Sequence, residues 1–97
     1  MRKNAQAVAE AWLAGKPKRE RTVGTDGRVV WSYNTIIALR SKTGQTFITN
    51  RKYSVTTSGH TNALRAHADY AKGFEKLEYL GGDRYRIDGK VVRVGVS

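Results

Sequence analysis

The chain has 97 residues and no cysteine, so it is expected to form one small core held by packing, without a disulfide framework or a thiolate zinc site. Lysine and arginine number 18 against 8 aspartates and glutamates, which gives a formal net charge of +10. An excess this large favours an anionic partner, such as nucleic acid, an anionic membrane face or an acidic protein.

The first 22 residues predict a helix followed by a basic arm. Asn4 is a typical helix N-cap residue, and the alanine-rich run 5–14 has helical periodicity. Val8 and Trp12 fall on one face of this helix, and the pattern leaves open whether they pack in the core or form an exposed anchor for another protein. Residues 16–22 contain four cations and either contact phosphates, with Lys18, Arg19 and Arg21 as the candidates, or act as a solubilising linker.

The middle of the chain predicts strands and then a helix. Residues 28–33 alternate in polarity, and the β-branched runs 35–40 and 45–49 flank a turn at 41–44. Residues 59–72 predict a helix with an apolar stripe that includes His67, and Gly73 is placed to cap it.

The last third predicts a β-meander, with turns at 81–83 and 88–89 and strands at 84–87 and 91–96. Together the elements predict an α+β fold: a small antiparallel sheet of about five to six strands, an N-terminal helix and one central helix. We expect a single domain over 1–97, composed of the helix and basic arm (1–22) and an α+β core (23–97).

Residues 27–68 contain no carboxylate, so the cations of this segment have no local partner. They predict an electropositive surface of the kind that binds phosphate without reading sequence. The alternative is that the absence of acids from this segment is due to chance, and that its cations lie on an ordinary solvent-exposed face. The candidate phosphate contacts in this segment are Arg28, Arg40, Arg51, Lys52 and Arg65.

A second candidate site is the start of the central helix, because free backbone N–H groups and the helix dipole attract anions. Ser58 and His60 could add donors there, unless these side chains only cap their own helix. His60 and His67 are seven residues apart, which does not fit a helical metal pair, so we predict no metal, no cofactor and no catalytic residue. A metal-dependent nuclease is the less favoured enzyme alternative.

Aromatic residues interleave with these cations at Trp31, Tyr33, Phe47 and Tyr53. Such a mixture allows bases to stack between phosphate contacts, although aromatic residues on strands usually lie in the core. We expect two of the four rings to be buried.

Two segments resemble small bacteriophage-encoded proteins that share a Ser-Tyr-x-Thr-x-Ile-Ala pattern and a later Tyr-Ser-x-Thr-Thr-Ser-x-His pattern. Here they occupy 31–38 and 53–60, within a likeness that covers roughly 28–66. The resemblance implies a phage accessory protein of unassigned activity that acts in the host cytoplasm.

The sequence therefore predicts a nucleic-acid-binding protein, with duplex DNA favoured and modest sequence selectivity. The alternative is a phage factor that docks on an acidic host protein through Val8 and Trp12. No stretch of about 18 apolar residues occurs, so we expect no membrane partner and a cytoplasmic location.

Overall fold

The computed structural model of this chain describes residues 3–51, 55–68 and 70–95, with the backbone alone for 3–5 and 55–58. These residues form two helices and nine strands. In chain order they are α1 (Lys3–Leu13), β1 (Lys18–Arg19), β2 (Val23–Thr25), β3 (Val29–Ser32), β4 (Thr35–Arg40), β5 (Thr46–Thr49), α2 (Val55–His67), β6 (Lys72–Phe74), β7 (Leu77–Gly81), β8 (Arg84–Ile87) and β9 (Lys90–Arg93).

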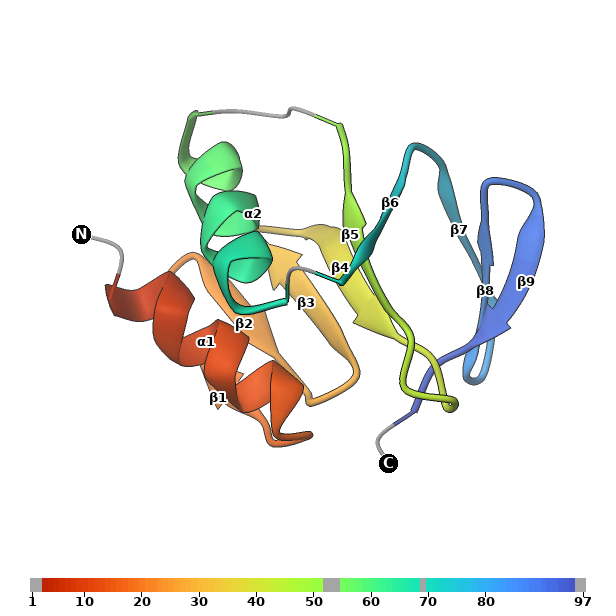
Figure 1. The fold of residues 1–97 in the computed structure, drawn as a ribbon, viewed down its shortest axis with the longest axis horizontal. Helices are drawn as coiled ribbons and strands as arrows, with labels where there is room; N and C mark the ends of the chain where they lie inside the picture. Colours follow the sequence, from red (N-terminus) through yellow and green to blue (C-terminus); the bar gives the residue numbers. More distant parts are fainter. Residues whose placement is uncertain (1–2, 52–54, 69, 96–97) are drawn as a thin grey trace.

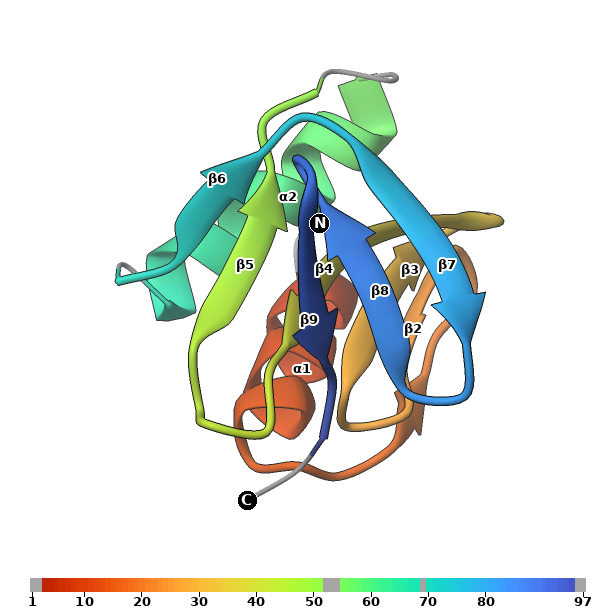
Figure 2. The same ribbon diagram turned by 90° about the vertical axis from the view of Figure 1, so that its right-hand side faces the viewer.

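The strands form two sheets that stack on each other. Strands β1 to β6 make a six-stranded sheet in sequence order, antiparallel except for the parallel pair β5–β6, which α2 connects. Strands β7 to β9 make a separate antiparallel sheet. Both helices lie on one side of the large sheet and the small sheet lies on the other (Figure 1), and Figure 2 shows the small sheet in front. The α+β class and the N-terminal helix are confirmed.

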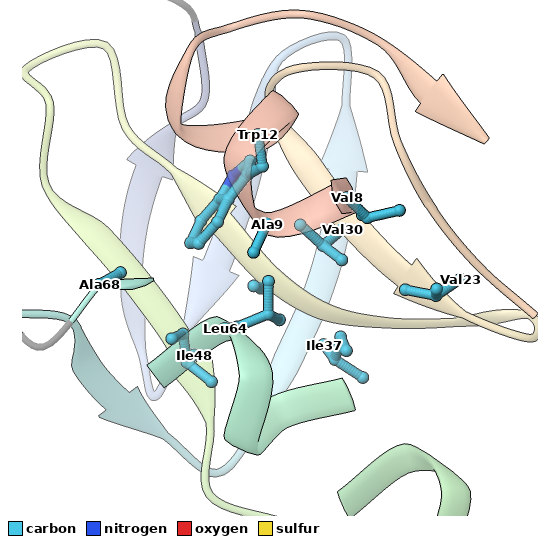
Figure 3. Packing of buried hydrophobic residues seen from close by; sticks show 10 residues of the cluster. Val8, Ala9, Trp12, Val23, Val30, Ile37, Ile48, Leu64 and Ala68 are labelled. Carbon is cyan, nitrogen blue, oxygen red and sulfur yellow. The ribbon is translucent and has the colours of Figure 1, made fainter. Parts of the chain in front are cut away.

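The first core lies between the helices and the large sheet. Val8 and Trp12 of α1 have no exposed surface, and they pack with Leu64 of α2 and Ile48 of β5 in one cluster (Figure 3). The indole Nε1 of Trp12 donates a hydrogen bond to the carbonyl of Arg28 at 3.0 Å. The idea that Val8 and Trp12 form an exposed anchor is therefore wrong, because both side chains are core.

The second core fills the space between the two sheets. Leu39 and Phe74 of the large sheet pack there with Tyr85 and Ile87 of β8 and with Val94. Strands β3 and β4 are consequently buried on both faces, although antiparallel sheets often leave one face in water.

Several sequence-based boundaries were wrong. The basic arm contributes an edge strand, because Lys18 and Arg19 pair with β2. The central helix ends at His67, and the predicted cap Gly73 lies inside β6. His67 is exposed, so its predicted place on the apolar stripe of the helix is wrong. The predicted strands at 35–40, 45–49 and 84–87 correspond to β4, β5 and β8. Neither α1 nor α2, the helices of the described residues, is long and apolar enough to cross a bilayer.

Candidate functional site

Arg40 is buried, although the sequence placed it among the phosphate contacts. It is 7% exposed, and burial lowers the pKa of its guanidinium. Its Nη1 donates to the carbonyl of Leu13 at 2.9 Å, and its Nη2 donates to the carbonyl of Gly27 at 3.0 Å. The prediction for Arg40 is therefore wrong: this side chain fastens the end of α1 and the β2–β3 turn to β4.

His60 is also buried, and it faces other side chains. Its Nδ1 lies 2.7 Å from Oγ of Ser32, and its Nε2 lies 3.4 Å from Oγ1 of Thr22. The imidazole thus connects α2 to the end of β3 and to the β1–β2 turn, so its predicted role as an exposed anion ligand is wrong. Lys52 and the side chain of Ser58 lie outside what the structure describes.

The two segments that carry the phage resemblance meet at this imidazole. Ser32 belongs to the first segment and His60 to the second, and their 2.7 Å contact is buried. Thr22 comes from neither segment, yet its hydroxyl approaches the other ring nitrogen. The common region of the two segments is therefore the end of the large sheet where the β1–β2 and β3–β4 turns lie.

The cations of 27–68 that the structure describes do not form a single face. Arg28 lies level with the end of β4, since its carbonyl accepts the amide of Arg40 at 2.9 Å, whereas Arg51 follows β5 at the other end of the sheet. Arg51 lines an open groove of about 730 Å³ together with two more cations, Lys76 and Arg86, and three acids, Glu75, Glu78 and Asp88. These acids of the C-terminal third offset the positive charge of the groove.

Two further cations of this segment are exposed, but their side chains are bonded to neighbouring groups. Nη2 of Arg65 donates to the carbonyl of Thr49 at 2.8 Å and to Oδ1 of Asn50 at 3.1 Å, which ties α2 to the end of β5. Nζ of Lys42 forms an ion pair with Asp83 at 2.9 Å. The expected continuous surface over 27–68 is therefore wrong, because the antiparallel turns distribute these cations over opposite ends of the sheet.

A different group of cations lies together along β1, the edge strand of the large sheet. Both residues of β1 are exposed, and Lys18 lies opposite Thr25 in the pairing with β2. At one end of the strand the α1–β1 connection touches the β2–β3 turn, since a Cβ on Gly27 would come within 3.2 Å of the amide nitrogen of Lys16. We call this group the basic edge: Lys16, Lys18, Arg19, Arg21 and Arg28.

The carboxylates nearest to the basic edge in sequence are few and already engaged. Glu20 pairs with Lys18 at 3.4 Å. Asp26 accepts the amides of Arg28 and Val29 at 2.9 and 3.0 Å. Five cations against these two carboxylates leave the basic edge with an excess of positive charge.

An arginine and an aromatic ring are stacked on the basic edge. The guanidinium carbon of Arg19 lies 5.8 Å from the ring centroid of Trp31, within cation–π range. The ring can lie against β2 because Gly24 has no side chain: a Cβ there would come within 2.7 Å of Cζ2 of Trp31. This stacking restrains a guanidinium that remains exposed.

Tyr33 lies at the end of this edge, in the β3–β4 turn. It is 53% exposed, and its φ of 57° is in the left-handed region, where a bulky residue is rare. Its amide donates to the carbonyl of Thr22 at 2.7 Å, so the turn lies directly against the β1–β2 turn and its neighbour Arg21.

A smaller groove of about 340 Å³ opens beside the same turn. It is lined by Asn34 from the turn, by Arg51, and by the aromatic pair Tyr79 and Tyr85, whose ring centroids are 5.1 Å apart. Burial, together with the nearby Tyr79 and Asp26, raises the pKa of the Tyr85 phenol.

The described residues offer little for acid–base or metal chemistry. No group of three or more metal-binding side chains is found among them. Ser32 and His60 have the spacing of a nucleophile and its base, but Ser32 is 1% exposed and the other imidazole nitrogen faces a threonine hydroxyl. A substrate cannot reach this hydroxyl, so the pair serves the fold.

The sequence did not identify the Tyr33 turn as a distinct feature. The run 28–33 was assigned to a strand, while the structure ends β3 at Ser32 and turns at Tyr33 and Asn34. The available signal was two β-branched runs separated by two residues, of which Asn34 is a typical turn residue. The turn was missed because tyrosine favours strands, so Tyr33 was assigned to the strand before it.

No curated protein and no solved structure was found to match this chain. Residues 4–81, which run from α1 to the end of β7, match the model described as Family of unknown function (DUF8033). The match covers more than half of the chain, and the protein therefore belongs to this family.

Proposed function

We propose that the protein binds nucleic acid through the basic edge, mainly by contacts to the phosphate backbone. The observation that carries the proposal is the exposed edge strand β1, where Arg19 lies over the half-buried ring of Trp31 and where Lys18 and the nearby Arg21 are also exposed. Lysine and arginine contacts to phosphate supply most of the sequence-independent affinity for DNA and RNA.

The arrangement of this surface suits phosphate. Guanidinium groups bind phosphate oxygens in a bidentate manner, and the stacked Arg19 loses less freedom on binding than an unrestrained arginine would. Contacts to phosphate position a protein but do not read the sequence, so selectivity among sequences is modest. Duplex DNA carries about one negative charge per 1.7 Å of helix axis and is the first ligand to test.

The test is a fluorescence anisotropy titration with duplex DNA at several salt concentrations between about 50 and 200 mM. If all five cations of the basic edge contact phosphate, the logarithm of affinity falls against the logarithm of salt with a slope of about −4.5. A slope near zero contradicts the proposal.

A matched pair of variants locates the surface. Replacement of Lys18, Arg19 and Arg21 by alanine is expected to lower the magnitude of the slope by about 3. The control removes the same charge elsewhere, with alanine at Lys72 on the opposite edge strand β6 and at Arg84 and Lys90 on the small sheet. Equal losses in both variants would show that net charge, and not the basic edge, drives binding.

The proposal includes a phage accessory role in the host cytoplasm, supported by the resemblance of segments 31–38 and 53–60. The alternative is docking on an acidic host protein. It was based on Val8 and Trp12 as an exposed anchor, and both side chains are buried in the core. A pull-down from nuclease-treated bacterial lysate distinguishes the two: a stoichiometric protein partner that survives the treatment favours the alternative.

A further inference from the structure

The Tyr33 turn combines exposure with backbone strain. The phenol ring is largely in solvent, while the backbone at Tyr33 has a φ of 57°. Two-residue hairpin turns that need a positive φ at their first position normally use glycine, asparagine or aspartate. The fold therefore accepts an unfavourable conformation to display an aromatic ring, and such strain is concentrated at functional sites.

The turn is held from two sides, which keeps this strained conformation in place. The residue before Tyr33 is Ser32, whose hydroxyl lies 2.7 Å from His60. The amide of Tyr33 itself donates to Thr22, whose hydroxyl approaches the other nitrogen of the same imidazole. Helix α2, β3 and the β1–β2 turn thus fix one backbone geometry, and the ring is presented on a rigid support.

The surroundings of the ring indicate its ligand. Arg21 is adjacent to Thr22 in the chain, so the backbone of Tyr33 lies next to the turn at the end of the basic edge, and the exposed Asn34 follows Tyr33. A flat ring beside phosphate-binding cations matches the way proteins hold unpaired nucleotides, with bases stacked on aromatic side chains. Bases inside a duplex are stacked on one another and do not offer a free face.

We infer that Tyr33 is a base-stacking residue, and that it gives the protein a preference for unpaired nucleotides over duplex. This inference rests on the proposed function, since the basic edge supplies the phosphate contacts to which stacking is added. It assigns the site to single-stranded DNA or RNA, or to unpaired stretches of either.

The experiment compares anisotropy titrations of a single-stranded DNA, a single-stranded RNA and a duplex DNA of equal length at one salt concentration. Tyr33→Ala is expected to weaken single-strand binding by roughly 5- to 150-fold, the range for loss of one base–aromatic stack. Duplex affinity is expected to change less than about twofold, and Tyr33→Phe is expected to retain single-strand binding, because the ring is kept.

Two further variants separate stacking from folding. Tyr33→Gly relieves the positive φ, so it is expected to raise or preserve the thermal midpoint while it lowers single-strand affinity as Tyr33→Ala does. Tyr70→Ala is the control, because Tyr70 is 87% exposed on the connection between α2 and β6, and it is expected to leave all affinities unchanged.

The outcomes are distinguishable. If the wild type binds with a steep salt dependence but Tyr33→Ala lowers single-strand and duplex affinity equally, or lowers neither, the stacking inference fails and the proposed function stands. If the wild type binds none of the three polymers, the proposed function fails and the inference fails with it.

Discussion

Arg40 shows how burial changes what a cation does. Its guanidinium satisfies the carbonyl of Leu13, in the last turn of α1, where the helix leaves carbonyls without partners and where its dipole favours positive charge. The second bond, to Gly27, joins the β2–β3 turn to the same side chain. The Nε atom has no hydrogen-bond partner, so the arrangement already carries some cost.

Arg40→Met is expected to lower the free energy of unfolding by about 1 to 3 kcal/mol, because the two carbonyls lose their donors while most of the volume is kept. Urea denaturation measures this change. Arg28→Met is the control, since this neighbouring arginine is exposed and is expected to change stability by less than about 0.5 kcal/mol. A variant at Arg40 as stable as the wild type would show that the two backbone contacts contribute nothing net.

At the scale of elements, the small sheet is joined to the large sheet near the β4–β5 turn. The carboxylate of Asp83, between β7 and β8, pairs with Lys42 at 2.9 Å and with Arg93 at 3.4 Å. The hydrogen bond from Lys42, and then the charges of Arg93 and Lys42, hold the pKa of Asp83 below its ordinary value despite opposing desolvation. Backbone bonds reinforce the junction, including Lys42 to the carbonyl of Arg93 at 2.9 Å.

This junction makes stability depend on pH with a defined sign. Since the carboxyl of Asp83 has a lower pKa in the folded state, its contribution is full above its ordinary pKa and is lost as the pH falls through the folded-state pKa. Asp83→Asn is expected to lower the thermal midpoint at neutral pH and to reduce the further loss on acidification. Glu78→Gln, which removes the more exposed ion pair with Arg86, is the control and is expected to leave the pH profile almost unchanged.

The elements that the sequence predicted are those with strong local periodicity. The run 35–40 is β-branched and bounded by turns, and it forms β4 as expected. Strand β1 was missed because lysine and arginine carry no strand pattern, and its pairing depends on the long-range position of β2. Strand β6 was missed because its parallel partner β5 is separated from it by a whole helix.

The candidate site was less predictable than the fold. The cations of β1 are exposed as expected, while Arg40 was assigned to the surface because it lies in the acid-free segment 27–68 and His60 because it lies near the start of the central helix. Their burial depends on contacts with Leu13 and Ser32, which are 27 and 28 residues away in the chain. A local sequence pattern does not reveal contacts between residues so far apart in the chain. The cations that are close together in the sequence are therefore not the ones that lie together in the structure.

At the scale of the whole molecule, the net charge of +10 sets the response to salt and to polyanions. We expect the thermal midpoint of the free protein to rise modestly as salt increases, because screening weakens the repulsion among the cations. Duplex DNA at about 100 times its dissociation constant is expected to stabilise the folded state by about 2.7 kcal/mol at low salt, with a smaller effect at high salt. Differential scanning fluorimetry measures both trends, and a midpoint unaffected by DNA would contradict the proposed function.

The coverage of the large sheet on both faces limits how any polymer can approach. Nucleic-acid modules with one open sheet face spread several bases across that face. Among the described residues, helices occupy one face of the large sheet and the second sheet occupies the other (Figure 1), which leaves the turns at its ends and its two edge strands, β1 and β6. An edge offers a long and narrow contact surface. Such a surface suits a single-stranded nucleic acid better than a double helix, which needs a broader one.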